Sequence, residues 1–205
     1  MEATTQTQLN QLLAKQDLSF SQATELFDAI MNGQLNDIEL TAALIALKLK
    51  GETSDEIAGA AASMRANAVP FQTSKTLLAD SCGTGGDGSN TINISTTAAI
   101  VAAAAGINMV KHGNRSVSSN SGSADLLKAL GINIDMSPEQ AAHCLDNTGF
   151  TFLFAPHYHS GVRHAMGVRT ALKSRTIFNI LGPLANPAAP EVQLLGVYDP
   201  SLCLP

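Results

Sequence analysis

The stretch Asp80-Ser81-Cys82-Gly83-Thr84-Gly85-Gly86-Asp87-Gly88 decides the fold that we expect for this chain. A short apolar run over residues 77–79 precedes it, and an alanine-rich segment over residues 98–105 follows and is predicted to be helical. A glycine-rich turn between a strand and a helix exposes backbone N–H groups that bind anions. The stretch therefore predicts a strand–loop–helix unit whose loop binds a phosphate compound. The alternative is a glycine loop that only turns the chain.

The glycines match the dinucleotide-binding pattern G-x-G-x-x-G letter for letter, but the residues that follow do not fit it. That pattern expects an acidic residue about 20 positions further on, where it binds a ribose hydroxyl. No Asp or Glu occurs between Gly88 and Asp125, and the same window contains Lys111 and Arg115. The P-loop pattern also fails, because no Gly-Lys-Ser/Thr follows the glycines. A basic window without acids favours a ligand with several phosphate charges.

The composition is that of a globular protein, with 45% hydrophobic and 14% charged residues in a chain of 205. That length suits one large domain or two modest ones. A net charge of −5 without an extended basic run argues against nucleic acid as a partner. The three cysteines form no disulfide or zinc pattern, and neither a signal-peptide pattern nor a membrane-spanning apolar run is present. We therefore expect a cytoplasmic protein with no membrane partner.

The first 70 residues are predicted to form only helices. Ser19-Phe20-Ser21-Gln22 and Thr53-Ser54-Asp55-Glu56 are capping-box patterns that begin helices, and a helical stripe over residues 38–49 ends at Gly51. The region contains no catalytic cluster. We interpret residues 1–70 as a helical domain, with helices around residues 160–185 as candidates to pack with it. We expect it to serve as a scaffold or to form a homodimer through the N-terminal helices.

After Val69-Pro70-Phe71 the pattern alternates between strands and helices. Strands are predicted near residues 77–80, 108–110, 132–134, 150–154 and 192–197. Helices are predicted at residues 96–105, 124–130 and 138–147, and residues 176–190 are interpreted as a crossing loop. The alternation predicts an α/β domain over residues 71–205, with a largely parallel sheet flanked by helices. Ligand loops lie at the carboxyl ends of such strands, so the loops after the first two strands should open on one edge.

Three polar clusters surround the predicted glycine loop. Asp87 either forms a turn or requires a divalent cation, because a bare carboxylate would repel phosphate. Asn93-Ile94-Ser95-Thr96 can cap the next helix, bind phosphate, or contribute a serine hydroxyl to a magnesium shell. A polar loop from Lys111 to Ser119, with Ser123 after it, supplies lysine, arginine and serine side chains that suit phosphate oxygens. A solvated loop without function is the alternative for this last cluster.

A fourth cluster comprises His157-Tyr158-His159 and the following Arg163, His164 and Arg169. The His-x-His pair suggests metal binding, but no third ligand stands at a familiar spacing, so a structural or substrate-contacting role is favoured. Arg169 is predicted either to bind a carboxylate through its planar guanidinium or only to solvate its helix.

Four blocks of the chain, taken in order, resemble the anthranilate phosphoribosyltransferase family of tryptophan biosynthesis. They are Gly83-Thr84-Gly85-Gly86-Asp87-Gly88, Asn93-Ile94-Ser95-Thr96, Lys111-His112-Gly113-Asn114-Arg115-Ser116-Val117-Ser118-Ser119 and Arg175-Thr176-Ile177-Phe178-Asn179-Ile180-Leu181-Gly182-Pro183-Leu184-Ala185-Asn186-Pro187. One block would be weak evidence, whereas four in register are specific. The resemblance implies transfer of the phosphoribosyl group of phosphoribosyl pyrophosphate to the amine of anthranilate, with Mg²⁺ as cofactor and pyrophosphate as leaving group.

The resemblance also implies roles for individual residues. The expected donor-binding residues are Gly83, Gly86, Asp87, Thr91, Asn93, Ser95, Thr96, Lys111, His112, Gly113, Asn114, Arg115, Ser116, Val117, Ser118, Ser119 and Ser123. The expected anthranilate-binding residues are Gly83, His112, Asn114, His159, Arg169, Gly182 and Pro183. Arg169 is expected to face the carboxylate, and Ser95 to ligate magnesium. No general base is assigned, because an aromatic amine is unprotonated at neutral pH and the reaction depends on positioning and leaving-group stabilisation.

The chain departs from the family pattern in one respect. The family continues past residue 205 and includes an adjacent Asp-Glu pair that holds magnesium, whereas no such pair follows Ser95 here. We therefore expect an N-terminal fragment that is inactive alone and whose remaining magnesium carboxylates lie beyond residue 205. Two other functions stay open. One is a pyrimidine nucleoside phosphorylase, which has a similar fold and similar phosphate loops, and the other is a non-catalytic binding or oligomerisation module.

Overall fold

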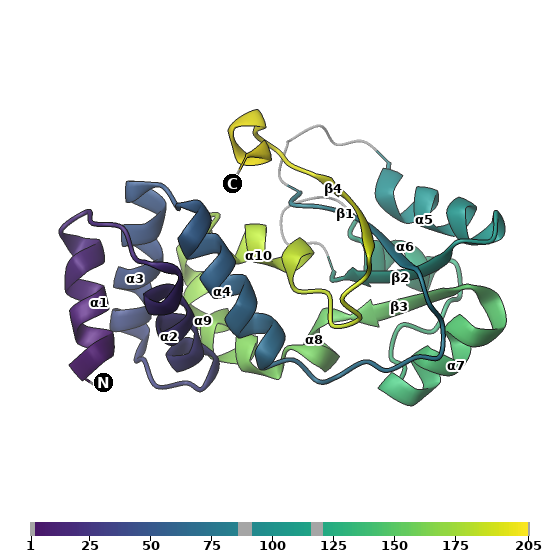
Figure 1. The fold of residues 1–205 in the computed structure, drawn as a ribbon, viewed down its shortest axis with the longest axis horizontal. Coiled ribbons are helices and arrows are strands. Elements are labelled where there is room, and N and C mark those ends of the chain that lie inside the picture. Colours follow the sequence, from purple (N-terminus) through teal and green to yellow (C-terminus); the bar gives the residue numbers. More distant parts are fainter. Residues whose placement is uncertain (1–2, 86–91, 116–120, 205) are drawn as a thin grey trace. The chain divides into compact units, whose positions relative to one another are not determined.

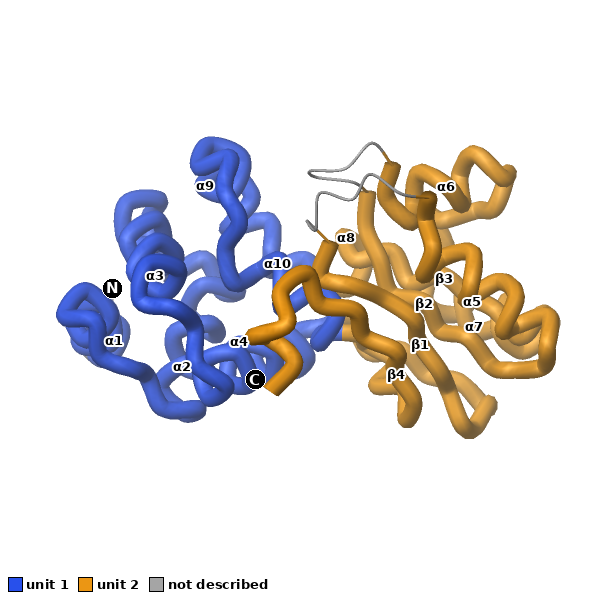
Figure 2. The backbone as a smooth tube through the Cα atoms, turned by 90° about the horizontal axis from the view of Figure 1, so that it is seen from above, with its two compact units in different colours: residues 1–68, 159–185, 205 blue, residues 69–158, 186–204 orange. Residues whose placement is uncertain are grey.

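A computed structural model of the chain describes residues 3–85, 92–115 and 121–204. The chain divides into two compact units (Figure 2). Unit 1 combines residues 1–68 with 159–185, and unit 2 combines residues 69–158 with 186–204. Unit 1 thus takes its helices from two stretches that most of unit 2 separates in the sequence. Among the described residues, no helix is long and apolar enough to cross a membrane.

Unit 1 consists of helices in the part of the chain that the structure describes (Figure 1). They are α1 (Ala3–Leu13), α2 (Phe20–Met31), α3 (Asp37–Lys50), α4 (Ser54–Ala66), α9 (Arg163–Leu172) and α10 (Phe178–Leu184), with the 3-10 turn η1 (Ser160–Val162) before α9. The two predicted capping boxes begin α2 and α4, because the hydroxyls of Ser19 and Thr53 accept from the backbone N–H three residues on. Another capping box, formed by Asn36 and Glu39, begins α3.

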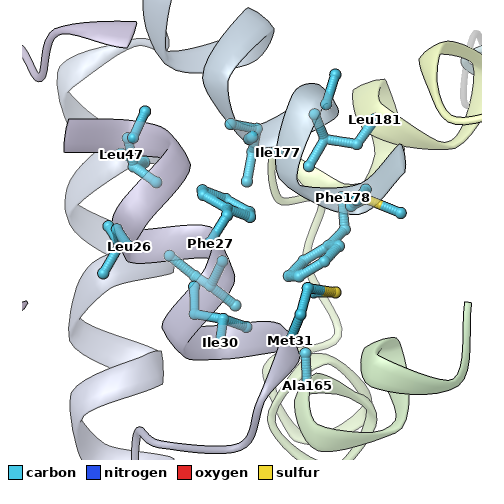
Figure 3. Close-up of a cluster of buried hydrophobic side chains, with 14 of the residues drawn as sticks. Leu26, Phe27, Ile30, Met31, Leu47, Ala165, Ile177, Phe178 and Leu181 are labelled. Carbon is cyan, nitrogen blue, oxygen red and sulfur yellow. The ribbon is translucent and has the colours of Figure 1, made fainter. Parts of the chain in front are cut away.

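One cluster of buried side chains joins the N-terminal helices of unit 1 to α9 and α10. Figure 3 shows Phe27 of α2 and Phe178 of α10 in this cluster. Their ring centroids are 5.7 Å apart, and the rings are tilted by 59°. Full burial of one such side chain contributes about 1.5–3 kcal/mol. The N-terminal helices and the later helices α9 and α10 therefore depend on a shared core.

The prediction of a crossing loop over residues 176–190 is wrong where α10 forms. Ile177, Phe178 and Leu181 are buried in the core of unit 1, at a spacing that places them on one face of a helix. The Asn179 side-chain oxygen accepts from the Thr176 N–H at 3.0 Å beside the start of the helix, and Pro183 lies one residue from its end. Burial of the apolar face outweighs a composition rich in proline and asparagine.

Unit 2, within its described residues, contains a four-stranded sheet in the order β3-β2-β1-β4, with each neighbouring pair parallel. The strands are β1 (Leu78–Gly83), β2 (Asn108–Gly113), β3 (Phe150–Phe154) and β4 (Val192–Gly196). The helices are α5 (Ile94–Ala104), α6 (Ser123–Ala129), α7 (Pro138–Thr148) and α8 (Ala155–Tyr158), and the 3-10 turn η2 spans Pro200–Cys203. The predicted fold class, a helical N-terminal region followed by a parallel sheet flanked by helices, is confirmed.

Alternation of side chains along β1, β2 and β3 gives this part of the sheet two buried faces. Val110 and Leu153 pack with Leu145 of α7 on one face. Met109 packs with Ala99 of α5 on the other. Helices thus cover both faces, as a parallel sheet requires.

Residues 132–134 do not form the predicted strand. Ile134 is buried and packs with Ala124 and Leu127 of α6 and with Phe152 of β3. Its apolar character therefore serves to cover the sheet rather than to extend it. An alternating apolar pattern does not distinguish a strand from an extended segment that packs over a sheet.

Candidate functional site

The candidate site lies at the carboxyl ends of β1 and β2. The two strands are parallel neighbours and end at Gly83 and Gly113, so the loops that follow them leave the same edge of the sheet, as predicted. β1 lies between β2 and β4, which is where the strand order reverses direction. Ligands of open parallel sheets bind outside the carboxyl ends of the strands at such a reversal.

Asn93 connects the two loop regions. It occupies the N-cap position of α5 but makes no side-chain capping hydrogen bond. Its Nδ2 instead donates to the Gly122 carbonyl at 2.9 Å and lies 3.4 Å from the Ser121 Oγ, immediately before α6. The start of α5 is therefore linked directly to the start of α6, an interaction that the sequence pattern did not predict.

Gly113 is a position where the site requires glycine. A Cβ atom there would overlap the Ser123 Oγ and would lie only 2.9 Å from Cε2 of Phe152. The Ser123 hydroxyl donates to the Asn114 carbonyl at 3.2 Å, which holds the end of β2 against the first turn of α6. The absence of a side chain at Gly113 thus allows Ser123 to lie close to it, and both are among the residues expected to bind the donor.

Thr84, the first residue after β1, is hydrogen-bonded to the end of β4 and to the residue two positions beyond it. Its N–H donates to the Gly196 carbonyl at 2.9 Å, and its hydroxyl accepts from the Tyr198 N–H at 3.1 Å. Thr84 is buried. The described beginning of the glycine loop is therefore anchored to the chain at and after the end of β4.

A buried polar network lies at the same end of the sheet. The polar loop was predicted to begin at Lys111, but β2 continues to Gly113, and Lys111 is 2% exposed within the strand. Its ammonium donates to the Ser81 carbonyl of β1 at 2.5 Å. The neighbouring Asp80 is also 2% exposed, and its Oδ2 accepts from Asn186 Nδ2 at 2.9 Å. Burial raises the pKa of Asp80 and lowers that of Lys111, because it disfavours the charged form of each group.

Asp80 and Asn186 are residues to which sequence reasoning assigned no function. The available signal was a charged side chain directly after a short apolar run in each strand, since Asp80 follows residues 77–79 and Lys111 follows residues 109–110. Asn186 carried no signal of its own, because only the fold brings it to β1.

The first turn of α5 contains two of the predicted hydroxyl groups. Ser95 is half-buried and Thr96 is buried. Backbone N–H groups in the first turn of a helix attract anions. The described residues include no group of three or more His, Cys, Asp or Glu side chains that could hold a metal ion. The sequence-based assignment of Ser95 to magnesium therefore requires oxygen ligands from elsewhere.

The remaining described residues of the second loop differ in exposure. His112 is buried in β2, whereas Asn114 and Arg115 are exposed just after it. The Arg115 guanidinium carbon lies 5.7 Å from the centroid of the Phe154 ring, so the aromatic face at the end of β3 supports this cation.

The predicted acceptor residues His159, Arg169, Gly182 and Pro183 belong to unit 1. Arg169, on α9, is half-buried, and its guanidinium carbon lies 5.0 Å from the centroid of the Phe178 ring. Burial lowers the pKa of Arg169, although an arginine stays charged at neutral pH. Burial also lowers the pKa of His159, against backbone hydrogen bonds to Ala185 and Met64 that raise it. His159 is therefore held toward its neutral form.

His157 has no metal-binding partners of the kind that the His-x-His pattern suggested in the described residues. Its Nε2 lies 3.5 Å from Oδ1 of Asp135, and its ring makes an edge contact with Phe154 at 5.3 Å between centroids. These contacts fit a structural role, which is one of the two roles, structural or substrate-contacting, that the sequence favoured. Seven predicted donor residues lie outside the described residues, namely Gly86, Asp87, Thr91, Ser116, Val117, Ser118 and Ser119.

Comparison with known protein families identifies the class of protein to which this fold and candidate site belong. Residues 75–205 match the glycosyl transferase family, a/b domain, and residues 6–68 match the helical bundle domain of the glycosyl transferase family. The chain belongs to the glycosyl transferase family.

Within that family, the chain is similar to anthranilate phosphoribosyltransferases. It is 78% identical over 203 residues to the enzyme of that name from Pseudoalteromonas translucida (strain TAC 125), covering 99% of this chain and 57% of that one. The crystal structure of anthranilate phosphoribosyltransferase from Thermus thermophilus gives a TM-score of 0.91 at 42% identity, covering 97% of this chain and 60% of that one. The Saccharomyces cerevisiae enzyme in complex with PRPP and Mg gives 0.88 at 31% identity, covering 100% and 61%. The chain thus spans about three fifths of the length of these relatives.

Proposed function

We propose that this chain forms the donor-binding part, and some of the acceptor-binding part, of an anthranilate phosphoribosyltransferase. The reaction would transfer the phosphoribosyl group of phosphoribosyl pyrophosphate to the amine of anthranilate and release pyrophosphate. The observation that carries the proposal is the carboxyl edge where β1, β2 and the first turn of α5 meet, since it offers glycines, helix N–H groups and a lysine. The likeness to enzymes of that name over 99% of the chain supports it.

The proposed donor site combines backbone and side-chain donors. The described residues that we assign to it are Gly83, Asn93, Ser95, Thr96, Lys111, His112, Gly113, Asn114, Arg115 and Ser123. Gly86, Asp87, Thr91 and Ser116 to Ser119 are assigned on sequence grounds alone. Donors that are already in place stabilise the negative charge that develops on departing pyrophosphate without reorganising during the reaction.

On sequence grounds we assign seven residues to acceptor binding, namely Gly83, His112, Asn114, His159, Arg169, Gly182 and Pro183. Arg169 would bind the anthranilate carboxylate through two N–H groups of its planar fork. The amine nitrogen would then form a bond to the anomeric carbon of the ribose as the bond from that carbon to pyrophosphate breaks. The amine is unprotonated at neutral pH, so the reaction needs positioning more than a strong base.

Magnesium, when bound, would neutralise the pyrophosphate leaving group. Ser95 is the ligand that we assign among the described residues, and one hydroxyl does not make a metal site. The residues described here therefore do not fit magnesium on their own, and the role of the chain in the reaction is to bind and orient the two substrates.

Calorimetric titration of the purified 205-residue chain with phosphoribosyl pyrophosphate, with and without MgCl₂, tests the donor site. Loss of anthranilate fluorescence in the presence of the donor tests the transfer. We expect donor binding to this chain, and phosphoribosyl transfer by a version extended to the length of its relatives. Thymidine phosphorolysis, with no response to phosphoribosyl pyrophosphate, would favour the nucleoside phosphorylase instead. Absence of donor binding under both conditions would contradict the proposal.

We also propose that unit 1 forms a homodimer through an apolar groove along α1 and α3. The groove is lined by Leu12, Leu13, Lys15, Asp37, Ile38, Thr41, Ala42, Ile45, Ala46, Leu49 and Lys50. Leu13, Ile38 and Leu49 are 59%, 82% and 76% exposed, which is unusual for large apolar side chains that share one surface. Lys15, Lys50 and Asp37 give the groove charges of both signs, which suits a self-complementary contact between two copies.

Light scattering coupled to size-exclusion chromatography tests the dimer. We expect the mass of two chains for the unmodified protein, and of one chain after Ile38→Glu. Ile107→Glu is a matched control in unit 2, because Ile107 is also exposed. A monomer in the unmodified protein would contradict the proposal.

We propose a cytoplasmic location on the ground that Cys82, Cys144 and Cys203 are free thiols, and fractionation of the cells that produce the protein would test it.

A further inference from the structure

Asp80 and Lys111 are the charged side chains buried in unit 2, among the residues that the structure describes. Each is 2% exposed. Burial of an isolated charge is unfavourable, and a buried ammonium without a counter-charge tends to lose its proton. A charged Lys111 in this position therefore needs a negative group close by.

Asp80 is placed to be that group. The Lys111 ammonium donates to the Ser81 carbonyl at 2.5 Å, and Asp80 directly precedes Ser81 on β1. The residue opposite Lys111 on β3 is Phe152, and neither β3 nor α5 contains an ionisable side chain. The ionisable groups that act on Lys111 are Asp80 and the Cys82 thiol. Burial raises the pKa of that thiol to about 12, so Cys82 stays neutral and Asp80 supplies the negative charge.

Asn186 fixes the position of Asp80. Its Nδ2 donates both to Oδ2 of Asp80 at 2.9 Å and to the Val110 carbonyl at 2.8 Å. Its Oδ1 accepts from the Ala188 N–H at 2.9 Å, which determines which end of the amide faces the carboxylate. Asn186 is 4% exposed. One buried amide thus ties the carboxylate of β1 to the backbone of β2, one residue before Lys111.

We propose that Asp80, held in place by Asn186, is a positioning residue that keeps Lys111 charged at the carboxyl ends of β1 and β2. This inference rests on the proposed function, in which Lys111 binds the phosphoribosyl donor. The lysine would then present its charge to the pyrophosphate group only while Asp80 is ionised. Asp80 itself would not touch the donor.

The titration of Lys111 tests the first part of this proposal without any ligand. In protein with ¹³C-labelled lysine, the Lys111 Cε signal is assigned by its loss in Lys111→Met and followed from about pH 6 to about pH 11. We expect Asp80→Asn to lower the midpoint by about one pH unit or more, because an opposite charge nearby shifts a pKa by about 1–3 units. Asn186→Ala should lower it by less. Asp28→Asn is the matched control, since Asp28 is a hydrogen-bonded carboxylate of unit 1.

Calorimetric titration with inorganic pyrophosphate tests the second part. The affinity of Asp80→Asn should fall more steeply between about pH 7 and about pH 9 than that of the unmodified chain, because Lys111 loses its proton earlier. A purely structural role of Asp80 would weaken binding equally at both pH values. Equal weakening would therefore overturn the proposal, as would an unchanged Lys111 midpoint in Asp80→Asn.

The two proposals fail in different ways. If the midpoint shifts but no variant binds pyrophosphate or phosphoribosyl pyrophosphate, the charge relation stands and the proposed function fails. If the unmodified chain binds and the midpoint does not move, the proposed function stands and the positioning role fails. Should Asp80→Asn not fold, Asn186→Ala decides: a lowered midpoint supports the positioning role, and an unchanged one overturns it.

Discussion

Each unit buries a carboxylate close to a lysine, but the two pairs are satisfied to different degrees. In unit 1, Glu56 is 0% exposed and accepts from the N–H groups of Leu18 and Thr53 and from the Lys50 ammonium, each at 2.9 Å. In unit 2, the ammonium of Lys111 donates to a backbone carbonyl, and Asp80 is held by a neutral amide. Glu56 and Lys50 therefore make a direct charge-assisted hydrogen bond. Asp80 instead acts on Lys111 through the Coulomb interaction between their charges.

The pKa shifts of the two lysines have opposite signs for this reason. Burial lowers the pKa of Lys50, but hydrogen bonds to Asp17 and Glu56 outweigh it, so the pKa is raised. Burial lowers the pKa of Lys111, and Asp80 offsets only part of the effect. A satisfied pair suits a scaffold, whereas strongly perturbed groups cluster where ligands bind. The contrast separates the helical scaffold from the ligand-binding edge.

The largest expected effect comes from breaking the scaffold pair. Glu56→Ala removes the acceptor of two backbone N–H groups and takes from Lys50 its buried carboxylate partner, so that the exposed Asp17 is the carboxylate left to it. We expect a loss of about 3–5 kcal/mol in the free energy of unfolding, as for other broken buried pairs. Urea unfolding measures this loss. Glu39→Ala is the matched control, because Glu39 holds the same place in the capping box of α3 but is only half-buried, and it should cost only about 0.5–1 kcal/mol. Similar losses for both would contradict the importance that we assign to burial.

Two glycines extend the comparison to backbone packing. A Cβ on Gly59 would overlap the Phe20 carbonyl and lie 2.9 Å from the Ala23 Cβ, where α4 meets α2. A Cβ on Gly113 would overlap the Ser123 Oγ. We expect Gly59→Ala and Gly113→Ala each to cost about 1–3 kcal/mol of unfolding free energy, as overpacking does. Only Gly113→Ala should also weaken binding of pyrophosphate in calorimetry.

Gly167→Ala is the control for both changes. Gly167 lies within α9, and apart from its chain neighbours and the backbone of its own helix no atom lies within 4 Å of an added Cβ, so alanine should stabilise the helix by about 0.5–1 kcal/mol. Weaker pyrophosphate binding by Gly59→Ala, with its structure intact, would show that the scaffold is not separate from the site.

Ligand affinities should divide between the units in the same way. Lys111→Ala is expected to weaken donor binding, and Arg169→Ala to weaken anthranilate binding, each by about tenfold or more, which corresponds to about 1.4 kcal/mol. Calorimetric titration of each variant with each substrate measures the division. Lys128→Ala and Arg163→Ala serve as controls, because both residues are exposed. Equal weakening of both substrates by both changes would contradict the division of roles.

The fold was largely predictable from the sequence because its signals are local. Capping boxes at Ser19 and Thr53 mark the starts of α2 and α4, and the glycine-rich turn marks the end of β1. Two of the errors, at residues 132–134 and in α10, arise where tertiary burial decides the conformation of a short apolar segment. Phe178, for example, becomes helical against the core formed by residues far earlier in the chain.

The candidate site was less predictable than the fold. The alternation of predicted strands and helices indicated which loops would share an edge of the sheet, because the carboxyl ends of parallel strands lie at the same edge. It did not show that Asn93 reaches Gly122, or that Asn186 reaches Asp80 across more than a hundred positions of sequence. Such contacts depend on the register of the sheet and on the return of the chain after α10, which no local pattern encodes.

The smallest expected effect is the pH dependence of stability, and it tests the opening contrast directly. The folded pKa of Lys50 lies above its unfolded value of 10.5, so its stabilising contribution is complete below pH 10.5 and is lost as pH rises through the folded pKa. The folded pKa of Lys111 lies below 10.5, so the unfolded chain binds more protons between the two values, and stability increases with pH there.

The stability difference between the unmodified chain and Lys50→Met should therefore shrink at high pH, by less than about 1 kcal/mol. The difference for Lys111→Met should change in the opposite direction. Urea unfolding between about pH 8 and about pH 12 measures both, with the exposed Lys48 of the same helix as control in Lys48→Met. Two differences that change in the same direction would mean that the charge balance at the edge of the sheet resembles that of the scaffold, and the contrast between the units would then rest on geometry alone.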